Sequence, residues 1–175
     1  MDRLREFAEK RSRLVAMLDR LGLDAVLIGN DFGGQSGLMV DPDSLRTFVF
    51  PGTKKLIDQA KSYGLKVIHH SCGSIYPIIQ DLIDLGVDSI HPIQALAQDM
   101  DAPTLKTGFE GKTSFCGGVD AQYLLVNGSP KQVSDKVHEL KQIFPTGLII
   151  SPSHEAILPD IPPANIEAMF NTIIS

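Results

Sequence analysis

Hydrophobic positions along the chain follow two alternating patterns. In the longer stretches, apolar residues recur three or four positions apart, which predicts amphipathic helices with one face against a core. Between these stretches lie short runs of mostly consecutive apolar residues, typical of strands buried on both faces of a parallel sheet. The five runs are 25–29, 66–70, 87–91, 113–116 and 148–150. The chain is therefore predicted to be an α/β domain with five strands alternating with helices.

Glycine and capping residues mark the predicted helix ends. Glycines precede the runs and suit the left-handed position that ends a helix. They are Gly22, Gly64, Gly86, Gly147 and, more weakly, Gly108 or Gly111. Asp41 and Ser129 each stand before a proline and predict helix starts, and Ser74 is predicted to cap the helix that follows it.

Two architectures fit five strands that alternate with helices. One is a small doubly wound sheet, and the other is part of a (β/α)₈ TIM barrel, about its last five βα units. A complete barrel typically needs about 250 residues, and this chain has 175. We expect a single domain over residues 1–175, with a leading helix over 1–22.

Composition narrows the classes of partner. The chain is 43% hydrophobic with a net charge of -5 and has no block of Lys and Arg, so a nucleic-acid partner is not expected. The charged amino terminus does not resemble a signal peptide, and no apolar run approaches the roughly 20 residues that cross a membrane. The two cysteines, Cys72 and Cys116, indicate a reduced, cytoplasmic protein.

Polar residues collect after all five runs, where the strands of either architecture present their carboxyl ends to ligands. We expect a small-molecule substrate there. The candidate substrate-binding residues are Asn30, Gln35, Gln94, Gly117 and Gly118. Gly33 and Gly34 also allow close approach of the backbone to a ligand.

His70 and Cys72 are the sharpest local feature of the sequence. In extended backbone, residues two apart point to the same side, so both side chains can reach one zinc ion. A catalytic zinc site has three protein ligands, and His154 and Cys116 are the candidates for the third. Alternatively, Cys72 is a small buried residue and His70 forms a wall of the pocket.

Asp31, Asp120 and His154 are the candidate catalytic residues. The two aspartates suit general acid–base work or the binding of polar substrate groups. Asp31 is alternatively a turn residue and Asp120 a helix N-cap. His91 and His138 are assigned structural roles.

Taken in order, the segments after the runs resemble the uroporphyrinogen decarboxylase superfamily from about residue 23 onwards. The segments are 30–37 with 41–43 and Pro51, 70–73, 86–88, 117–120 with 129–130, and 153–154 leading to 162–166. The resemblance implies a (β/α)₈ barrel and places the chain on roughly its last five strands.

The superfamily includes two chemistries. One is the cofactor-free decarboxylation of a tetrapyrrole, and the other is methyl transfer between a corrinoid and a thiol or similar acceptor, assisted by zinc. His70 and Cys72 match the first two zinc ligands of the methyltransferases, and His154 stands near the place of their later Cys. His154 and Asp120 are instead similar to the decarboxylases. Because the His-x-Cys pair has a role only in metal chemistry, methyl transfer is favoured, with the corrinoid as substrate or bound to a partner protein.

Five strands of an eight-stranded barrel leave apolar edges near 25–29 and 148–150, and open edges pair with other chains. We therefore expect either a homo-oligomer, a split enzyme or a chain that lacks an N-terminal segment. A non-catalytic barrel fragment that acts as a binding or assembly module is a further alternative.

Overall fold

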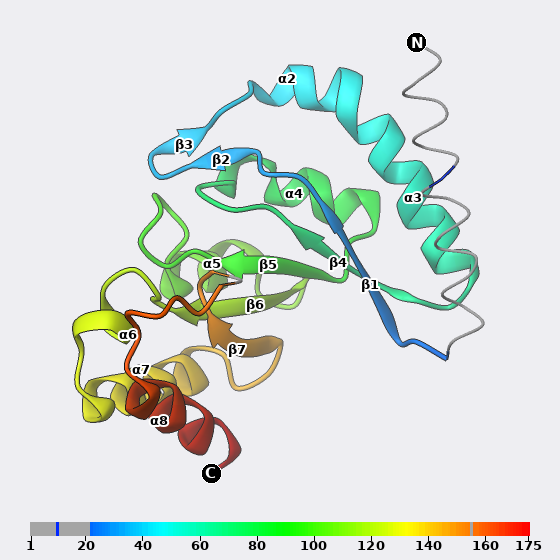
Figure 1. The fold of residues 1–175 in the computed structure, drawn as a ribbon. Coiled ribbons are helices and arrows are strands. Elements are labelled where there is room, and N and C mark those ends of the chain that lie inside the picture. Colours follow the sequence, from blue (N-terminus) through cyan, green and yellow to red (C-terminus); the bar gives the residue numbers. More distant parts are fainter. Residues whose placement is uncertain (1–9, 11–21, 155) are drawn as a thin grey trace.

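The computed structural model describes residue 10 and residues 22–154 and 156–175. Five strands form one parallel sheet whose spatial order equals their order along the chain (Figure 1). They are β1 (Ala25–Gly29), β4 (Lys66–His70), β5 (Ser89–Ile93), β6 (Ser114–Val119) and β7 (Leu148–Pro152). The five predicted strands are thus confirmed, although β5 begins two residues later than predicted. The leading helix predicted over 1–22 lies almost wholly outside the described residues.

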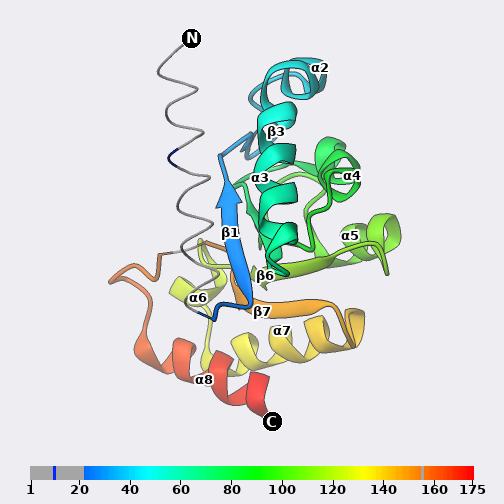
Figure 2. The same cartoon turned by 90° about the vertical axis from the view of Figure 1, so that its right-hand side faces the viewer.

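Helices connect successive strands and lie on the outside of the curved sheet, as Figure 2 shows for α3, α4, α5 and α7. This is the arrangement of part of a (β/α)₈ barrel. The helical elements are α2 (Pro42–Ser44), the π-helical η1 (Leu45–Val49), α3 (Phe50–Ser62), α4 (Tyr76–Leu85), α5 (Ala102–Phe109), α6 (Leu124–Asn127), α7 (Pro130–Ile143) and α8 (Pro163–Ile174).

The core lies between the sheet and these helices. Val67, Ile90 and Phe115 of the strands have no exposed surface, and neither do Ile79 of α4 and Leu105 of α5. Burial of each such side chain contributes about 1.5–3 kcal/mol. The predicted apolar stripes of the described helices are therefore core positions.

Helix starts follow the predicted chemistry in two of three cases. Asp41 accepts hydrogen bonds from the amides of Asp43 and Ser44 at the start of α2, and Ser129 forms a capping box with Gln132 at the start of α7. The prediction for Ser74 is wrong, because α4 begins at Tyr76 and has no side-chain cap. Gly86 is the left-handed C-cap of α4, and Gly64 and Gly111 directly follow the C-cap residues of α3 and α5 with positive φ angles, as predicted. Gly147 also has a positive φ angle but lies three residues beyond the C-cap of α7, and the predicted helix before Gly22 lies outside the described residues.

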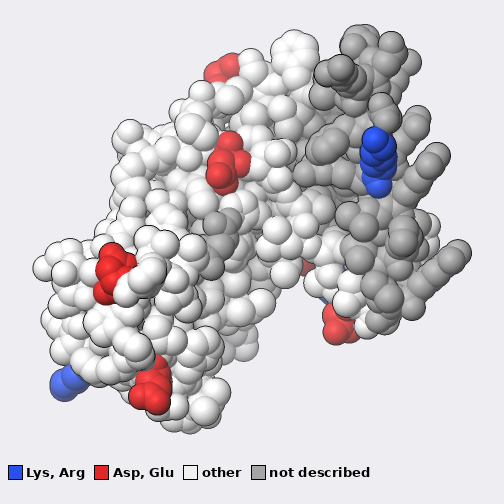
Figure 3. Space-filling view, viewed as in Figure 1, with Lys and Arg blue, Asp and Glu red and all other residues white. Residues whose placement is uncertain are grey.

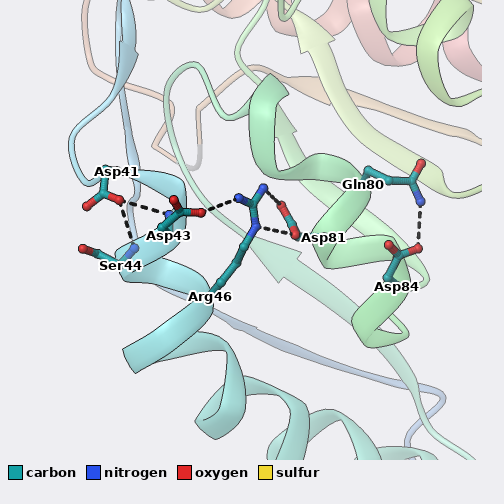
Figure 4. Close-up of polar contacts among 7 residues, drawn as sticks. All are labelled: Asp41, Asp43, Ser44, Arg46, Gln80, Asp81 and Asp84. Atoms are coloured by element: carbon teal, nitrogen blue, oxygen red, sulfur yellow. Dashed lines mark hydrogen bonds and ion pairs between the residues drawn. The ribbon is translucent and has the colours of Figure 1, made fainter.

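Arg46 of η1 ties this irregular segment to α4, as Figure 4 shows. Its Nε and Nη2 donate to the two carboxylate oxygens of Asp81, both at 2.9 Å, and its Nη1 donates to Asp43. The two parallel bonds to Asp81 fix both the distance and the orientation of the two elements. The segment that follows the β1 loop is thereby held against the sheet's helical layer.

The other face of the sheet is open at its apolar positions. Side chains alternate along a strand, so residues that neighbour the core positions point to this inner face. Leu27 of β1 and Ile149 of β7 lie on it and are 59% and 56% exposed. Near the amino ends of the strands the same face borders a cavity of about 370 Å³ that includes Ile68 and Ser114.

A small hairpin that the sequence did not predict lies beyond the carboxyl ends of the strands. It consists of β2 (Gly33–Gly34) and β3 (Gly37–Leu38). The amide of Ser74 donates to the carbonyl of Gly34, and a Cβ at Gly33 would lie 2.8 Å from the carbonyl oxygen of Cys72. Gly33 was predicted to admit a ligand, but the structure instead packs it against the loop that carries Cys72.

Candidate functional site

Asp31, His70 and Cys72 meet where β1 and β4 end. The register pairs Gly29 with His70, so the loop after β1 starts beside the last residue of β4. The Cys72 amide donates to Asp31 Oδ1 at 3.0 Å, and His70 Nε2 lies 3.2 Å from the same oxygen. Cys72 Sγ is 3.7 Å from His70 Nε2. The ligand atoms of all three residues lie within 4.8 Å of one another, which defines the Asp31–His70–Cys72 cluster.

The electrostatics of the cluster favour an ionised Asp31. The hydrogen bond from the Cys72 amide is the main cause that lowers the pKa of Asp31, and the nearby His70 lowers it further against partial burial. The carboxylate remains 55% exposed, whereas the His70 side chain is only 13% exposed. The cluster thus combines a half-exposed anion with a sheltered imidazole and a thiol.

His69 precedes the cluster but belongs to the core side of β4. Its ring stacks on Phe32 with centroids 5.9 Å apart. Burial, with a smaller contribution from His70, lowers the pKa of His69 to about 4. His69 is therefore neutral at physiological pH and supports the Phe32 loop.

His91 is a site residue that the sequence analysis missed. It lies on β5 in register with His70, and the Nδ1 atoms of the two rings are 2.9 Å apart. The sequence did contain a signal for His91, because it ends the predicted strand after the one that carries His70. Residues in register on neighbouring parallel strands point to the same face of the sheet. His91 contacts the cluster directly through His70.

The predicted substrate-binding glutamines join loops around the cluster. Gln94 Oε1 accepts from the Gly73 amide at 2.6 Å, and its Nε2 donates to Gln35 at 3.2 Å. Gln35 in turn donates to the Leu96 carbonyl. Gln94 thus fixes the backbone beside Cys72, and Gln35 holds Gln94. Asn30 is exposed next to Asp31.

Gly117 and Gly118, also predicted to bind substrate, face protein atoms. A Cβ at Gly117 would lie 2.6 Å from the Ile93 nitrogen, and one at Gly118 would lie 3.1 Å from the Leu140 side chain. Packing of β6 against β5 and α7 explains both glycines without a ligand.

Asp120 acts as a backbone cap. Its two carboxylate oxygens accept hydrogen bonds from the amides of Gln122, Tyr123 and Leu124, and the residue is 7% exposed. These contacts favour a structural role at the turn into α6, although the N-cap position of that helix is Tyr123 and not Asp120.

The two predicted third ligands lie apart from the Asp31–His70–Cys72 cluster. Cys116 Sγ is 3.5 Å from Ser151 Oγ on the inner face of β6 and β7. His154 borders a different cavity of about 330 Å³ with Gln122 and Asp160, and its Nε2 is buried with no hydrogen-bond partner among the described residues. Asp31 occupies the place beside His70 and Cys72 that was expected for one of them.

Figure 3 shows one face of the molecule with acidic side chains scattered over it and no gathering of Lys or Arg among the described residues. Within the same part of the chain, no helix is long and apolar enough to cross a membrane.

Parallel strands in barrel order, with a polar cluster at their carboxyl ends, define an α/β barrel-type protein. The chain matches the family described as uroporphyrinogen decarboxylase (URO-D) over residues 6–175 and belongs to this family. No curated protein matches it.

Among solved structures, the chain resembles a methyltransferase from Methanosarcina mazei, with a TM-score of 0.75 and 20% identity. The match covers 94% of this chain and 46% of that protein, so the chain spans about half the length of the structure it resembles. A structure described as native KDPGal is matched with a TM-score of 0.45 and 14% identity, over 94% of this chain and 66% of that one. The first likeness supports the fold, including the partial barrel.

Proposed function

We propose that this chain carries the zinc site of a methyltransferase that moves a methyl group between a corrinoid and a thiol. The observation that carries the proposal is the Asp31–His70–Cys72 cluster, whose ligand atoms lie within 4.8 Å of one another. Thiolate, imidazole and carboxylate are the protein ligands of zinc, and three of them leave a fourth position open for a substrate. The donor set therefore fits a catalytic zinc ion.

Bound zinc would supply Lewis acidity that holds a substrate thiol as its nucleophilic thiolate at neutral pH. The chain's residues prepare this chemistry. The Cys72 amide keeps Asp31 turned towards His70, and the hydrogen bond that the Gly73 amide donates to Gln94 steadies the loop that carries Cys72. With a corrinoid as the methyl donor, a sulfur–carbon bond would replace the cobalt–carbon bond, the electron pair of the broken bond would remain with the corrinoid, and the thiol proton would pass to solvent.

A decarboxylase-type lyase acting on a tetrapyrrole is the second candidate. His154 supports it, because its buried Nε2 faces no protein partner among the described residues and the residue borders a cavity of about 330 Å³. An imidazole nitrogen there can hydrogen-bond to a substrate carboxylate. This reaction would require no metal at the Asp31–His70–Cys72 cluster.

The zinc content of the purified chain and its variants, measured after dialysis, tests the proposed metal site. We expect stoichiometric zinc in the wild-type protein and in Cys116→Ser, which is the matched thiol control, and strongly reduced zinc in Cys72→Ser and Asp31→Asn. Zinc that survives Cys72→Ser, or a wild-type protein without zinc, would refute the metal site.

The two reactions are separated by their substrates. Loss of the methyl group from methylcobalamin in the presence of small thiols, followed by visible absorbance, is expected for the zinc-loaded protein and not for Cys72→Ser. Release of CO₂ from a porphyrinogen, lost in His154→Leu but retained in Cys72→Ser, would instead establish the lyase.

A further inference from the structure

The contact between His70 and His91 is the least explained contact at the site. Both residues lie in register on neighbouring strands, their Nδ1 atoms are 2.9 Å apart and their ring centroids 5.1 Å apart. At that distance one nitrogen carries the proton and the other accepts it, since a neutral imidazole has one N–H and one acceptor nitrogen.

We propose that His91 is a positioning residue for His70, and that the hydrogen bond between them reverses its direction when the Nε2 atom of His70 binds a metal ion. The inference rests on the proposed zinc site. It concerns which ring nitrogen of each imidazole carries the proton, and the number of protons on the pair stays the same.

In the metal-free protein, Asp31 determines which of the two histidines donates the hydrogen bond between them. Its Oδ1 lies 3.2 Å from His70 Nε2 and is acceptor-only when ionised, so Nε2 carries the proton of a neutral His70. The Nδ1 atom of His70 is then an acceptor, and His91 Nδ1 donates to it. His91 is therefore in its Nδ1–H form.

With a metal on Nε2, the same geometry requires the opposite arrangement. The lone pair of Nε2 is used, so the single proton of a neutral His70 must be on Nδ1 and is donated to His91. His91 then carries its own proton on Nε2. The proton lost from Nε2 of His70 is balanced by the one gained at Nε2 of His91, with solvent as the intermediary.

This contact has the form that usually supports a metal-bound histidine. Such a ring donates its second N–H to a neighbouring acceptor, and loss of that acceptor lowers metal affinity by about 10–100-fold. Here the acceptor is itself an imidazole on a strand of the rigid sheet. The ring of His70 is thus held both by its own strand and by β5.

Two readouts test the inference: zinc affinity by competition with a chelating dye, and the ¹⁵N chemical shifts of the histidine rings with and without zinc. We expect His91 to change from the Nδ1–H to the Nε2–H form on addition of zinc. His91→Phe should weaken zinc binding by about 10–100-fold, and His91→Asn, whose amide can donate or accept near the position of Nδ1, should recover most of that loss. His138→Asn, on the exposed face of α7, is the matched control and should bind like the wild type.

The outcomes separate this inference from the proposed function. Zinc binding that requires Cys72 but is unchanged in His91→Phe, or a His91 ring that keeps its proton on Nδ1, would overturn the role of His91 and leave the zinc site intact. Absence of zinc binding in the wild type would overturn both. Circular dichroism and thermal unfolding of His91→Phe distinguish a lost contact from a lost fold.

Discussion

Gly73 is a residue at which the candidate site depends on the absence of a side chain. Its φ angle is 78°, and a Cβ there would lie 2.3 Å from the backbone of Gly33. The β2–β3 hairpin therefore rests directly on the loop that carries Cys72.

Replacement of Gly73 by alanine is expected to lower the free energy of unfolding by about 2–5 kcal/mol, because left-handed strain and overpacking both contribute. It should also weaken zinc binding, since the loop of Cys72 must shift. Gly111→Ala is the matched control: φ is 74° but no atom lies within 4 Å of the added Cβ, so a loss of about 1 kcal/mol is expected. Urea unfolding checks both values, and equal losses would contradict the close-approach argument.

At the level of single residues, the sequence predicted part of the Asp31–His70–Cys72 cluster. The spacing of His70 and Cys72 was sufficient because strand parity fixes the direction of residues two apart. The position of Asp31 depends on the path of the loop after β1, and that path depends on the hairpin, which has no pattern beyond its glycines. For the same reason the third ligand was sought at His154 and Cys116.

Among the elements, the amino ends of β4, β5 and β6 are joined by Asp88. Its carboxylate accepts from the Val67 amide at 2.7 Å and pairs with Lys61 of α3, and its carbonyl accepts from the Ser114 amide. Burial opposes ionisation, but the hydrogen bonds from Lys61 and Val67 outweigh it and lower the pKa of Asp88. Asp88 thus links β4, β6 and α3 at the amino ends of the strands.

The lowered pKa gives a pH dependence of defined sign. The contribution of ionised Asp88 to stability is fully present above its unfolded pKa of about 3.9, and it is lost as the pH falls through the lower folded pKa. Asp88→Asn should reduce the free energy of unfolding at pH 7 by about 1–3 kcal/mol and by less at pH 3. Urea unfolding at the two pH values tests this, and an equal loss at both would show that ionisation is irrelevant.

Strands and long helices were predictable because each has a regular apolar period and a glycine or capping residue at its end. The start of α4 was not, because Ser74 is drawn into the contact with the hairpin. Its amide donates to Gly34, and Tyr76 instead begins the helix. Tertiary contacts override a local capping signal there.

At the scale of the whole fold, the sheet formed by the described residues ends at β1 and β7. Leu27 and Ile149, on these two strands, are more than half exposed. Barrel geometry was implied by the family resemblance, whereas strand pattern alone left a doubly wound sheet equally open. The inner face therefore offers apolar surface and strand edges to a partner.

We expect the isolated chain to associate in solution, with a mass above that of a monomer by size exclusion with light scattering. Leu27→Lys and Ile149→Lys should shift the equilibrium towards smaller species, because a charge replaces an apolar contact. Phe48→Lys is the matched control, since Phe48 is 81% exposed on η1, away from the sheet. A compact monomer of the wild-type chain would contradict the expectation, as would equal effects of all three substitutions.

Each strand of this sheet after β1 pairs with the sheet strand that comes before it in the sequence. During synthesis, a new strand therefore always finds its neighbour already made, and the sheet can grow in one direction as the ribosome delivers each βα unit. Such local connectivity shortens the loops that must close and speeds folding. The Asp31–His70–Cys72 cluster lies at the ends of β1 and β4 alone, so it would be assembled before β7 is translated.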